Sequence, residues 1–343
     1  MSTKVFTMQH EKLKSSIGKT QRPLIYRQPI KAIWITILAV ILTIIYLYVG
    51  RLFFDNIFDF LAFTFIGYIV PWQVAAHMFE NWPASKLSKN PVRAGVIQGI
   101  IFWVIFIVYS WLLMYLTGKP LSAMFPFIET SIFVFAVWFF IFDNETGLSG
   151  KQPLQGILSW LIITAVGFLL VDSLKIDITW IWFPAAIGLF LGFYKWPVHW
   201  MKQPLKGIFA GFLMGAITWI YYLVLVRLGM DPLTFTTETL SWVTGNLFLI
   251  ILTFTMLFWT VITNNWPARK FGQPAKGIIN TFLGVVSAII LYIINVNIVP
   301  NTFTDLLNSF LFWSVLLMWL WGLLFTQKLW FAGYTFEDLA HEK

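Results

Sequence analysis

The fold of this chain is decided by the stretch KQPLKGIF at residues 202–209, because close copies of it recur along the whole sequence. A Pro suits the first turn of a helix, since its φ is already helical and its missing N–H would be unpaired there. The Gln before it can cap the helix, and the Gly after it lets a neighbouring helix approach closely. Each copy therefore predicts the start of a helix. The copies read RQPIKAI at 27–33, KNPVRAGVI at 89–97, KQPLQGIL at 151–158, KQPLKGIF at 202–209 and GQPAKGII at 272–279.

The composition places these helices in a lipid bilayer. Of the 343 residues, 59% are apolar, 11% are charged and none is Cys, whereas soluble chains carry about 25% charged residues. A helix needs roughly 20 apolar residues to cross the hydrocarbon layer, so the apolar content suffices for about ten crossings. These figures exclude a soluble domain, a disordered chain and a disulfide scaffold. The absence of Cys also excludes thiolate nucleophiles and Cys-ligated metal centres, and we expect no cofactor and no metal.

Apolar runs that are long enough, or nearly long enough, to cross a bilayer follow one another along the chain. They are continuously apolar rather than alternating, which argues against a β-barrel. We therefore predict an all-α, polytopic integral membrane protein with about ten transmembrane helices. The runs fall at about 31–50, 57–79, 94–117, 125–142, 154–171, 178–194, 205–226, 239–262, 277–298 and 306–326.

A second motif defines the repeating unit. Three of the loops carry a Trp-Pro pair shortly before the Gln-Pro stretch, at Trp82-Pro83, Trp196-Pro197 and Trp266-Pro267. The unit is therefore a two-helix hairpin that begins at Gln-Pro and ends at Trp-Pro, and five tandem copies account for ten helices. We divide the chain into a basic N-terminal segment (1–26), a transmembrane domain (27–330) with units at about 27–83, 89–146, 151–197, 202–267 and 272–330, and a C-terminal tail (331–343).

The basic surplus predicts the orientation in the membrane. Lys and Arg total 23 against 15 Asp and Glu, and cytoplasmic loops retain Lys and Arg. With ten crossings both termini lie on one side, together with 19 of the basic residues, and we place that side in the cytoplasm. We expect no nucleic-acid partner, because topology explains the charge. The N-terminal segment either lies as a basic helix on anionic lipid or is a disordered tail. The four basic residues on the opposite side are Arg51, Lys119, Lys175 and Arg227.

The repeated motif admits a structural and a functional interpretation. In the structural one its residues start, cap, anchor and pack the helices without any ligand. In the functional one, several helix N-termini with nearby cations face the cytoplasm and bind an anionic solute or a lipid headgroup. Gln155 replaces the cation in the third unit, which weakens a symmetric ring of charges. The candidate contacts are Lys31, Arg93, Lys206 and Lys276.

Polar residues within the apolar runs are candidates for a solute or proton pathway, because they are costly in a membrane. Glu129 lies near the start of the fourth run, and Gln73 and His77 share a face of the second run at a spacing of four. Asn246 is a candidate pore-lining residue, whereas Asn280, Asn295 and Asn308 are expected to hydrogen-bond between helices. The candidate pathway residues are Glu129, Gln73, His77 and Asn246.

These features favour a transporter, permease or channel for a small solute or ion. The alternative is a non-transporting membrane subunit or scaffold that binds lipid or a partner membrane protein. An enzyme is less favoured, because the sequence contains no H-E-x-x-H metal motif, no phosphate-binding P-loop, no Gly-rich dinucleotide motif and no G-x-S-x-G nucleophile motif. The lipid bilayer is the one partner that the composition requires.

Overall fold

The protein is described here by a computed structural model. The described part of the chain is helical and contains no strand. The candidate residues Gln73 and His77, and most of the predicted run at 178–194, lie outside it. The described residues are 30–68, 74, 78–79, 82–88, 91–137, 151–174, 185, 192–193, 198, 200–202, 205–230, 240–263 and 265–325.

The helices begin close to the predicted positions. In the described ranges α5, α7 and α11 start at or directly after the Pro of a repeated motif, as the position of that Pro predicts. The bounds are α2 (Ile30–Gly50), α3 (Ile57–Tyr68), α4 (Ala84–Leu87), α5 (Pro91–Thr117), α6 (Phe125–Ala136), α7 (Leu154–Leu174), α9 (Leu205–Arg227), α10 (Leu240–Leu257, continued by a π-helical turn, Phe258–Ile262), α11 (Ala275–Ile298) and α12 (Phe303–Phe325), with 3₁₀ turns at Leu121–Met124 and Ala268–Lys270.

Six of the described helices are long and apolar enough to cross a membrane, as in a multi-pass integral membrane protein. Shorter apolar helices accompany them, among them α3 and part of α7. These findings confirm an all-helical chain of membrane type in the ranges described. The six are α2, α5, α9, α10 with its π-helical turn, α11 and α12.

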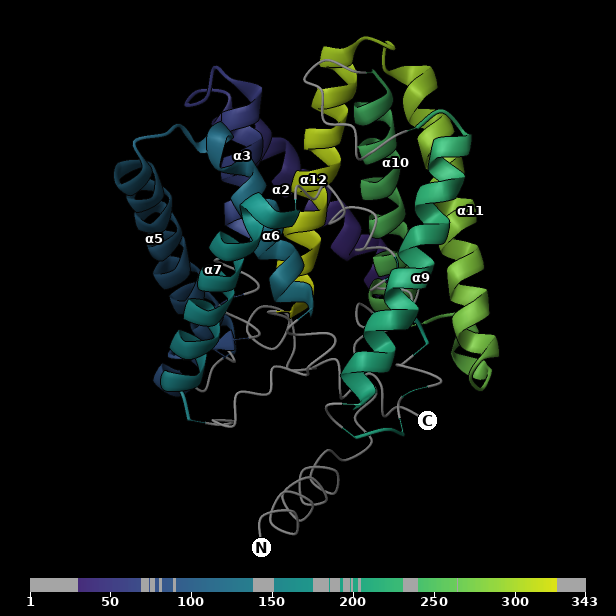
Figure 1. Cartoon of the computed structure of the whole chain (residues 1–343), viewed down its shortest axis with the longest axis horizontal. Helices are drawn as coiled ribbons and strands as arrows, with labels where there is room; N and C mark the ends of the chain where they lie inside the picture. Colours follow the sequence, from purple (N-terminus) through teal and green to yellow (C-terminus); the bar gives the residue numbers. More distant parts are fainter. Residues whose placement is uncertain are drawn as a thin grey trace, which may run out of the picture.

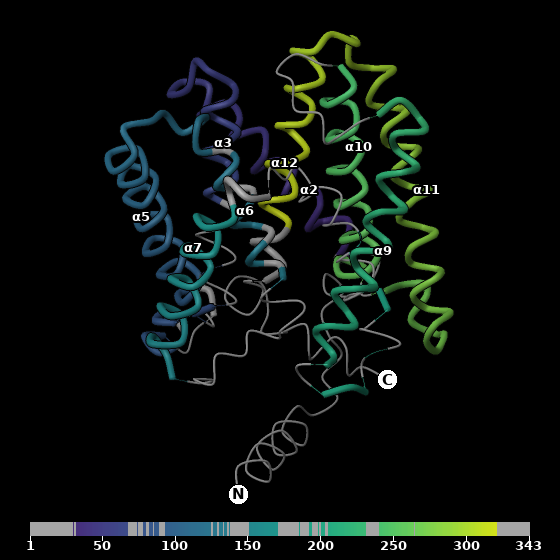
Figure 2. Tube along the Cα trace, in the orientation of Figure 1, coloured from purple at the N-terminus to yellow at the C-terminus, as the bar shows by residue number. Residues whose placement is uncertain are grey.

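The helices lie in two groups with α12 and α2 between them (Figure 1). One group contains α3, α5, α6 and α7, and the other contains α9, α10 and α11, as the trace in Figure 2 also shows. Helix α12 packs against members of both groups, since it contacts α3 as well as α10 and α2. The last described helix, α12, therefore lies between the first described helix, α2, and the helices α3 and α10.

Two classes of helix differ in what surrounds them. In α10 with its π-helical turn, 83% of the most apolar 18-residue window is buried inside the protein, against 22% in each of α2, α9 and α11. The second set exposes Ile, Val and Phe side chains, for example Ile37 and Ile41 on α2. An apolar helix that is buried all round belongs to the interior of a bundle, whereas an apolar exposed face suits contact with lipid.

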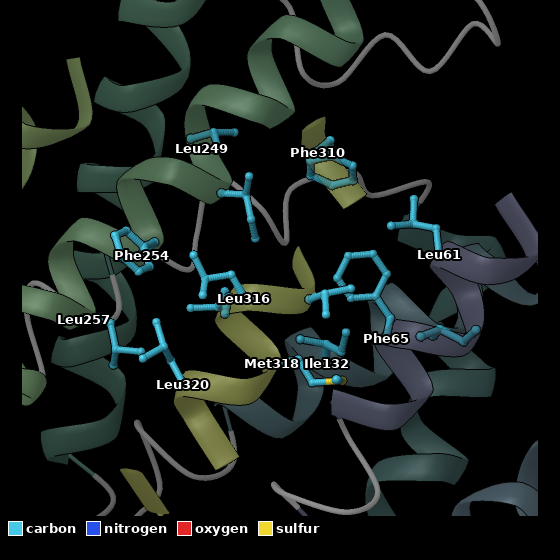
Figure 3. Packing of buried hydrophobic residues seen from close by; sticks show 14 of the residues in the cluster. Leu61, Phe65, Ile132, Leu249, Phe254, Leu257, Phe310, Leu316, Met318 and Leu320 are labelled. Atoms are coloured by element: carbon cyan, nitrogen blue, oxygen red, sulfur yellow. The ribbon is translucent and has the colours of Figure 1, made fainter. Parts of the chain in front are cut away.

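The interior between the two groups is filled by apolar side chains. Phe310 of α12 contacts Phe65 of α3 and Trp242 of α10, with ring centroids 6.3 and 6.4 Å apart. In a membrane such packing stabilises through close van der Waals contact, because lipid is as apolar as the protein interior. Figure 3 shows further members of this cluster, including Leu61, Ile132, Leu249, Phe254, Leu257, Leu316, Met318 and Leu320.

Candidate functional site

The repeated Gln-Pro motif forms a contact between distant parts of the chain at the start of α7. The Gln152 side chain donates from Nε2 to the carbonyl of Met78, at 2.8 Å. Its Oε1 accepts the backbone N–H of Gly156, at 3.3 Å. One amide therefore caps the first turn of α7 and fixes that turn to residue 78, which belongs to the first predicted hairpin.

The same contact occurs at the start of α11. Gln273 Nε2 donates to the carbonyl of Gly192 at 3.0 Å, and Gln273 Oε1 accepts the N–H of Gly277 at 3.3 Å. We call these two arrangements the Gln clasps. The predicted capping role of the Gln is confirmed at both places. Its bond to a carbonyl about eighty residues away in sequence follows from no local pattern.

The Gly of each clasp packs directly on an aromatic ring. A Cβ atom added to Gly156 would lie 2.6 Å from the ring of Phe79, and one added to Gly277 would lie 2.2 Å from the ring of Phe193. Both distances are far below van der Waals contact. The close approach that the Gly predicts is thus confirmed, and its partner is a Phe directly after the accepting residue.

A polar turn lies beside the second clasp. Asn265, in the third Trp-Pro loop, is buried and has a positive φ of 55°, a conformation that Asn tolerates better than most residues. Its Oδ1 accepts a hydrogen bond from Asn280 Nδ2 of α11 at 2.5 Å. Thr263 Oγ1 contacts the carbonyls of Trp259 and Trp266. These bonds tie the end of the π-helical turn to the start of α11.

The candidate cationic positions lie on different helices and in different environments. Arg93 on α5 is exposed, whereas Lys206 on α9 and Lys276 on α11 are half-buried. The side chain of Lys31 lies outside the described residues. Gln155, which replaces the cation in the third unit, is buried. An uncharged residue suits this position, because burying an unpaired cation is far more costly than burying an amide.

Of the candidate pathway residues, Asn246 is the one whose side chain the structure describes. It is fully buried in α10 and donates from Nδ2 to the carbonyl of Trp242 at 3.0 Å. Glu129 belongs to α6, but its side chain lies outside the described residues, as do Gln73 and His77. The structure therefore places one of the four candidates on the most buried helix.

The expected hydrogen bond between helices is confirmed for Asn295, at the opposite end of the bundle, whereas Asn280 and Asn308 pair with residues outside helices. Asn295 Oδ1 of α11 accepts from Ser309 Oγ at 2.6 Å and from Trp313 Nε1 at 3.2 Å, both on α12. Asn308 of α12 accepts from Arg51 Nη2, directly after α2. These bonds fix α12 to its neighbours on two sides.

The acidic residues of the described ranges do not gather into a metal site. Asp59 Oδ1 accepts the backbone N–H of Ser122 at 2.8 Å and so anchors the loop before α6. Asp55 is exposed. Among the described residues there is no group of three His, Asp or Glu side chains that would hold a metal ion.

Sequence reasoning missed several buried polar residues, among them Gln98 of α5. Its side chain is 1% exposed, and in the part of the chain that the structure describes neither amide atom has a hydrogen-bond partner. The signal available in the sequence is a Gln one helical turn after Ala94, which occupies the small-residue position of the repeated motif. A polar residue on the predicted packing face is a candidate by the same reasoning as Asn246.

No protein-family model matches the chain, and neither a curated protein nor a solved structure is significantly similar to it.

Proposed function

We propose that the protein is a membrane transporter or channel for a small solute, built from five tandem hairpins that close into a ring. In this arrangement ten helices cross the membrane. The first helices of the hairpins, among them α2, α5, α7, α9 and α11, face lipid. The second helices, among them α3, α6, α10 and α12, surround the axis, and both termini lie in the cytoplasm.

The order of helix contacts supports a closed ring. In the described ranges, three first helices pack on the second helix of the preceding hairpin: α5 on α3, α7 on α6 and α11 on α10. Helix α2 belongs to the first predicted hairpin, and it packs on α12 of the fifth. The second helices also contact each other, as α3 does with α6 and α12, and α10 with α12. A linear row of hairpins would leave α2 and α12 far apart.

The Gln clasps support the same ring, because each joins its hairpin to the one two before it rather than to the preceding one. The clasp of the third hairpin reaches the first, and the clasp of the fifth reaches the third, so each reaches two hairpins back. Two steps back from the first hairpin in a ring of five is the fourth. Helix α2 contacts the fourth hairpin at its π-helical turn, Phe258–Ile262. Ile262 precedes its Trp-Pro proline by five residues, as Met78 and Gly192 precede theirs.

The observation that carries the proposed function is the enclosure of α10 together with Asn246. A ring places the second helices around one axis, and the interior of a helix bundle is a usual place for a ligand pathway. Asn246 is a polar residue on the most enclosed of these helices. A polar side chain at membrane depth is a functional candidate. The aromatic contact of Phe65, Phe310 and Trp242 then corresponds to a conformation closed toward the outside.

Asn246 is tested by flux into proteoliposomes, with KCl, urea and glycerol as solutes and light scattering as the readout. We expect Asn246→Leu to reduce the flux of the conducted solute about tenfold, the effect of losing one or two hydrogen bonds to it. The matched control is Thr253→Val on the same helix. Thr253 is fully buried, but its hydroxyl donates to the carbonyl of Leu249 at 2.8 Å, so flux should change less than twofold. Equal loss in both variants would contradict a pathway role for Asn246.

The orientation is tested by cysteine labelling, which has no background because the chain contains no Cys. Lys119→Cys and Leu228→Cys should react with a membrane-impermeant maleimide on intact cells. Lys151→Cys and Lys270→Cys should react only after the membrane is permeabilised. All four side chains are exposed, so a difference in labelling reports the side of the membrane and not burial in the protein. Labelling of Lys151→Cys in intact cells would contradict cytoplasmic termini.

A second candidate function is a non-transporting subunit or scaffold that binds lipid or a partner membrane protein. The observation in its favour is the dense apolar packing of α3, α10 and α12 (Figure 3). A scaffold needs no pathway, and such packing stabilises it. The flux experiment separates the two functions, because a scaffold moves none of the solutes. The repeated cationic positions on α5, α9 and α11 then serve as contacts for anionic headgroups.

A further inference from the structure

We propose that the side chain of Gln98 binds a neutral, largely apolar molecule that carries one hydroxyl or carboxamide group. This inference does not depend on transport, since a scaffold would present the same site. It starts from the finding that the Gln98 amide is buried with neither its N–H₂ nor its carbonyl oxygen paired in the described part of the chain. Buried polar groups are nearly always paired, so an exception requires a specific explanation.

The surroundings of Gln98 are apolar. It lies on the buried face of α5, one turn after Ala94 and one turn before Phe102. Ala94 packs with Ala84, and the ring of Phe102 contacts the ring of Phe79 with centroids 5.7 Å apart. Both flanking contacts are therefore made with the segment 79–84 at the end of the first hairpin. Along α5, Gln98 lies between the two residues that make these contacts, Ala94 and Phe102.

Two other Gln side chains, Gln152 and Gln273, show what a structural amide does. The amide of Gln152 uses both its atoms, one on Met78 and one on Gly156, and Gln273 does the same on α11. Gln98 forms no such bonds within the described ranges. A buried unpaired amide destabilises a protein, most of all where lipid replaces water. A ligand that pairs with the amide would offset that cost, whereas an amide that is never paired contributes nothing to folding.

The chemistry of the side chain limits the ligand. An amide presents a donor and an acceptor side by side, so it pairs with a group that both accepts and donates, such as a hydroxyl or a carboxamide. It carries no charge to balance an ion. The rings of Phe79 and Phe102 and the methyl groups of Ala84 and Ala94 suit an apolar body. A medium-chain alcohol has both features.

Stability distinguishes binding from folding. Gln98→Leu removes the unpaired amide and keeps the volume similar, so we expect the midpoint of thermal unfolding in detergent to rise by about 1–3 °C. The matched control is Thr43→Val on α2. Thr43 is also fully buried, but its hydroxyl is paired with the carbonyl of Ala39 at 2.7 Å, so this variant should not gain stability. A fall in the midpoint for Gln98→Leu would make Gln98 a structural residue and overturn the proposal.

Binding is tested by photolabelling of the full chain in phosphatidylcholine vesicles. The probe is an eight-carbon alcohol with a diazirine, and its control is the matching diazirine alkane without the hydroxyl. We expect the alcohol to label residues 79–106, unlabelled octanol to displace it, and Gln98→Leu to reduce the labelling about fivefold, the effect of one hydrogen bond. The alkane should label both proteins equally.

Two results would overturn the proposal: equal labelling of both proteins by the alcohol, or the same loss with the alkane, which would mean apolar adsorption alone. Neither result depends on the flux experiment. A protein that moves none of the solutes but binds the alcohol through Gln98 keeps this inference while losing the proposed transport. A protein that conducts a solute but fails the labelling test loses this inference alone.

Discussion

Gly277→Ala will destabilise the protein by about 1–3 kcal/mol, as overpacking of a tight contact does. The added Cβ would lie 2.2 Å from the ring of Phe193, so the ring or the start of α11 must move. Movement of either also disturbs the Gln273 clasp, because Gly277 N–H donates to Gln273 Oε1. The measurement is the midpoint of unfolding in detergent. Gly156→Ala should act in the same way through Phe79.

The control for this prediction is Gly215→Ala in the middle of α9. Nothing lies within 4 Å of a Cβ added there, so the higher helix propensity of Ala should stabilise the protein by up to about 1 kcal/mol. A second variant, Gly277→Ala with Phe193→Ala, should recover most of the loss caused by the added methyl, measured against Phe193→Ala alone. If the midpoint of unfolding of Gly277→Ala equals that of the unaltered protein, the packing of Phe193 on α11 is not a tight contact.

Gln273→Leu will cost about 2–4 kcal/mol, since it leaves both the Gly192 carbonyl and the Gly277 N–H without their described partner. Gln152→Leu should cost a similar amount at the first clasp. Because the two clasps lie at the starts of different helices, α7 and α11, and share no residue, their effects should add when the variants are combined. Denaturant or thermal unfolding of the purified chain measures both.

The control for Gln273→Leu is an amide that hydrogen-bonds only within its own helix. Asn297 Nδ2 donates to the carbonyl of Ile293 at 2.7 Å, and the residue is exposed at the end of α11. Asn297→Leu should therefore change stability by less than about 0.5 kcal/mol. A loss of stability as small as this for Gln273→Leu would mean that the clasp contributes little to holding the start of α11 to Gly192.

The clasps show which part of the structure could be predicted from sequence. The bond from Gly277 N–H to Gln273 Oε1 joins residues four apart, so a Gln before a helix-starting Pro was enough to predict it. The bond to Gly192 joins residues whose proximity depends on how the helices are arranged in space. No local pattern encodes that arrangement. The need for Gly at this position was predictable, and its partner, Phe193, was not.

Helices α2 and α10 show a second limit. Both are apolar enough to cross a membrane, yet α2 exposes side chains along its length and α10 is almost entirely buried. Hydropathy cannot separate them, because lipid and the interior of the bundle are equally apolar. The same limit affects the candidate site. Polarity singles out Asn246 in the sequence, but packing places it on the most enclosed helix. Gln98 is just as polar, and its burial could not be predicted from the sequence.

The contact between α2 and α12 has a consequence for how the protein is made. Helix α2 leaves the ribosome before the other described helices, and α12 leaves it after them, at about 5–20 residues per second. For tens of seconds α2 therefore lacks the helix on which it packs, and the Arg51 side chain lacks its partner Asn308. During that time the face of α2 that later meets α12 is open to lipid or to an insertion factor. The contact between α2 and α12 can form only after α12 has been synthesised.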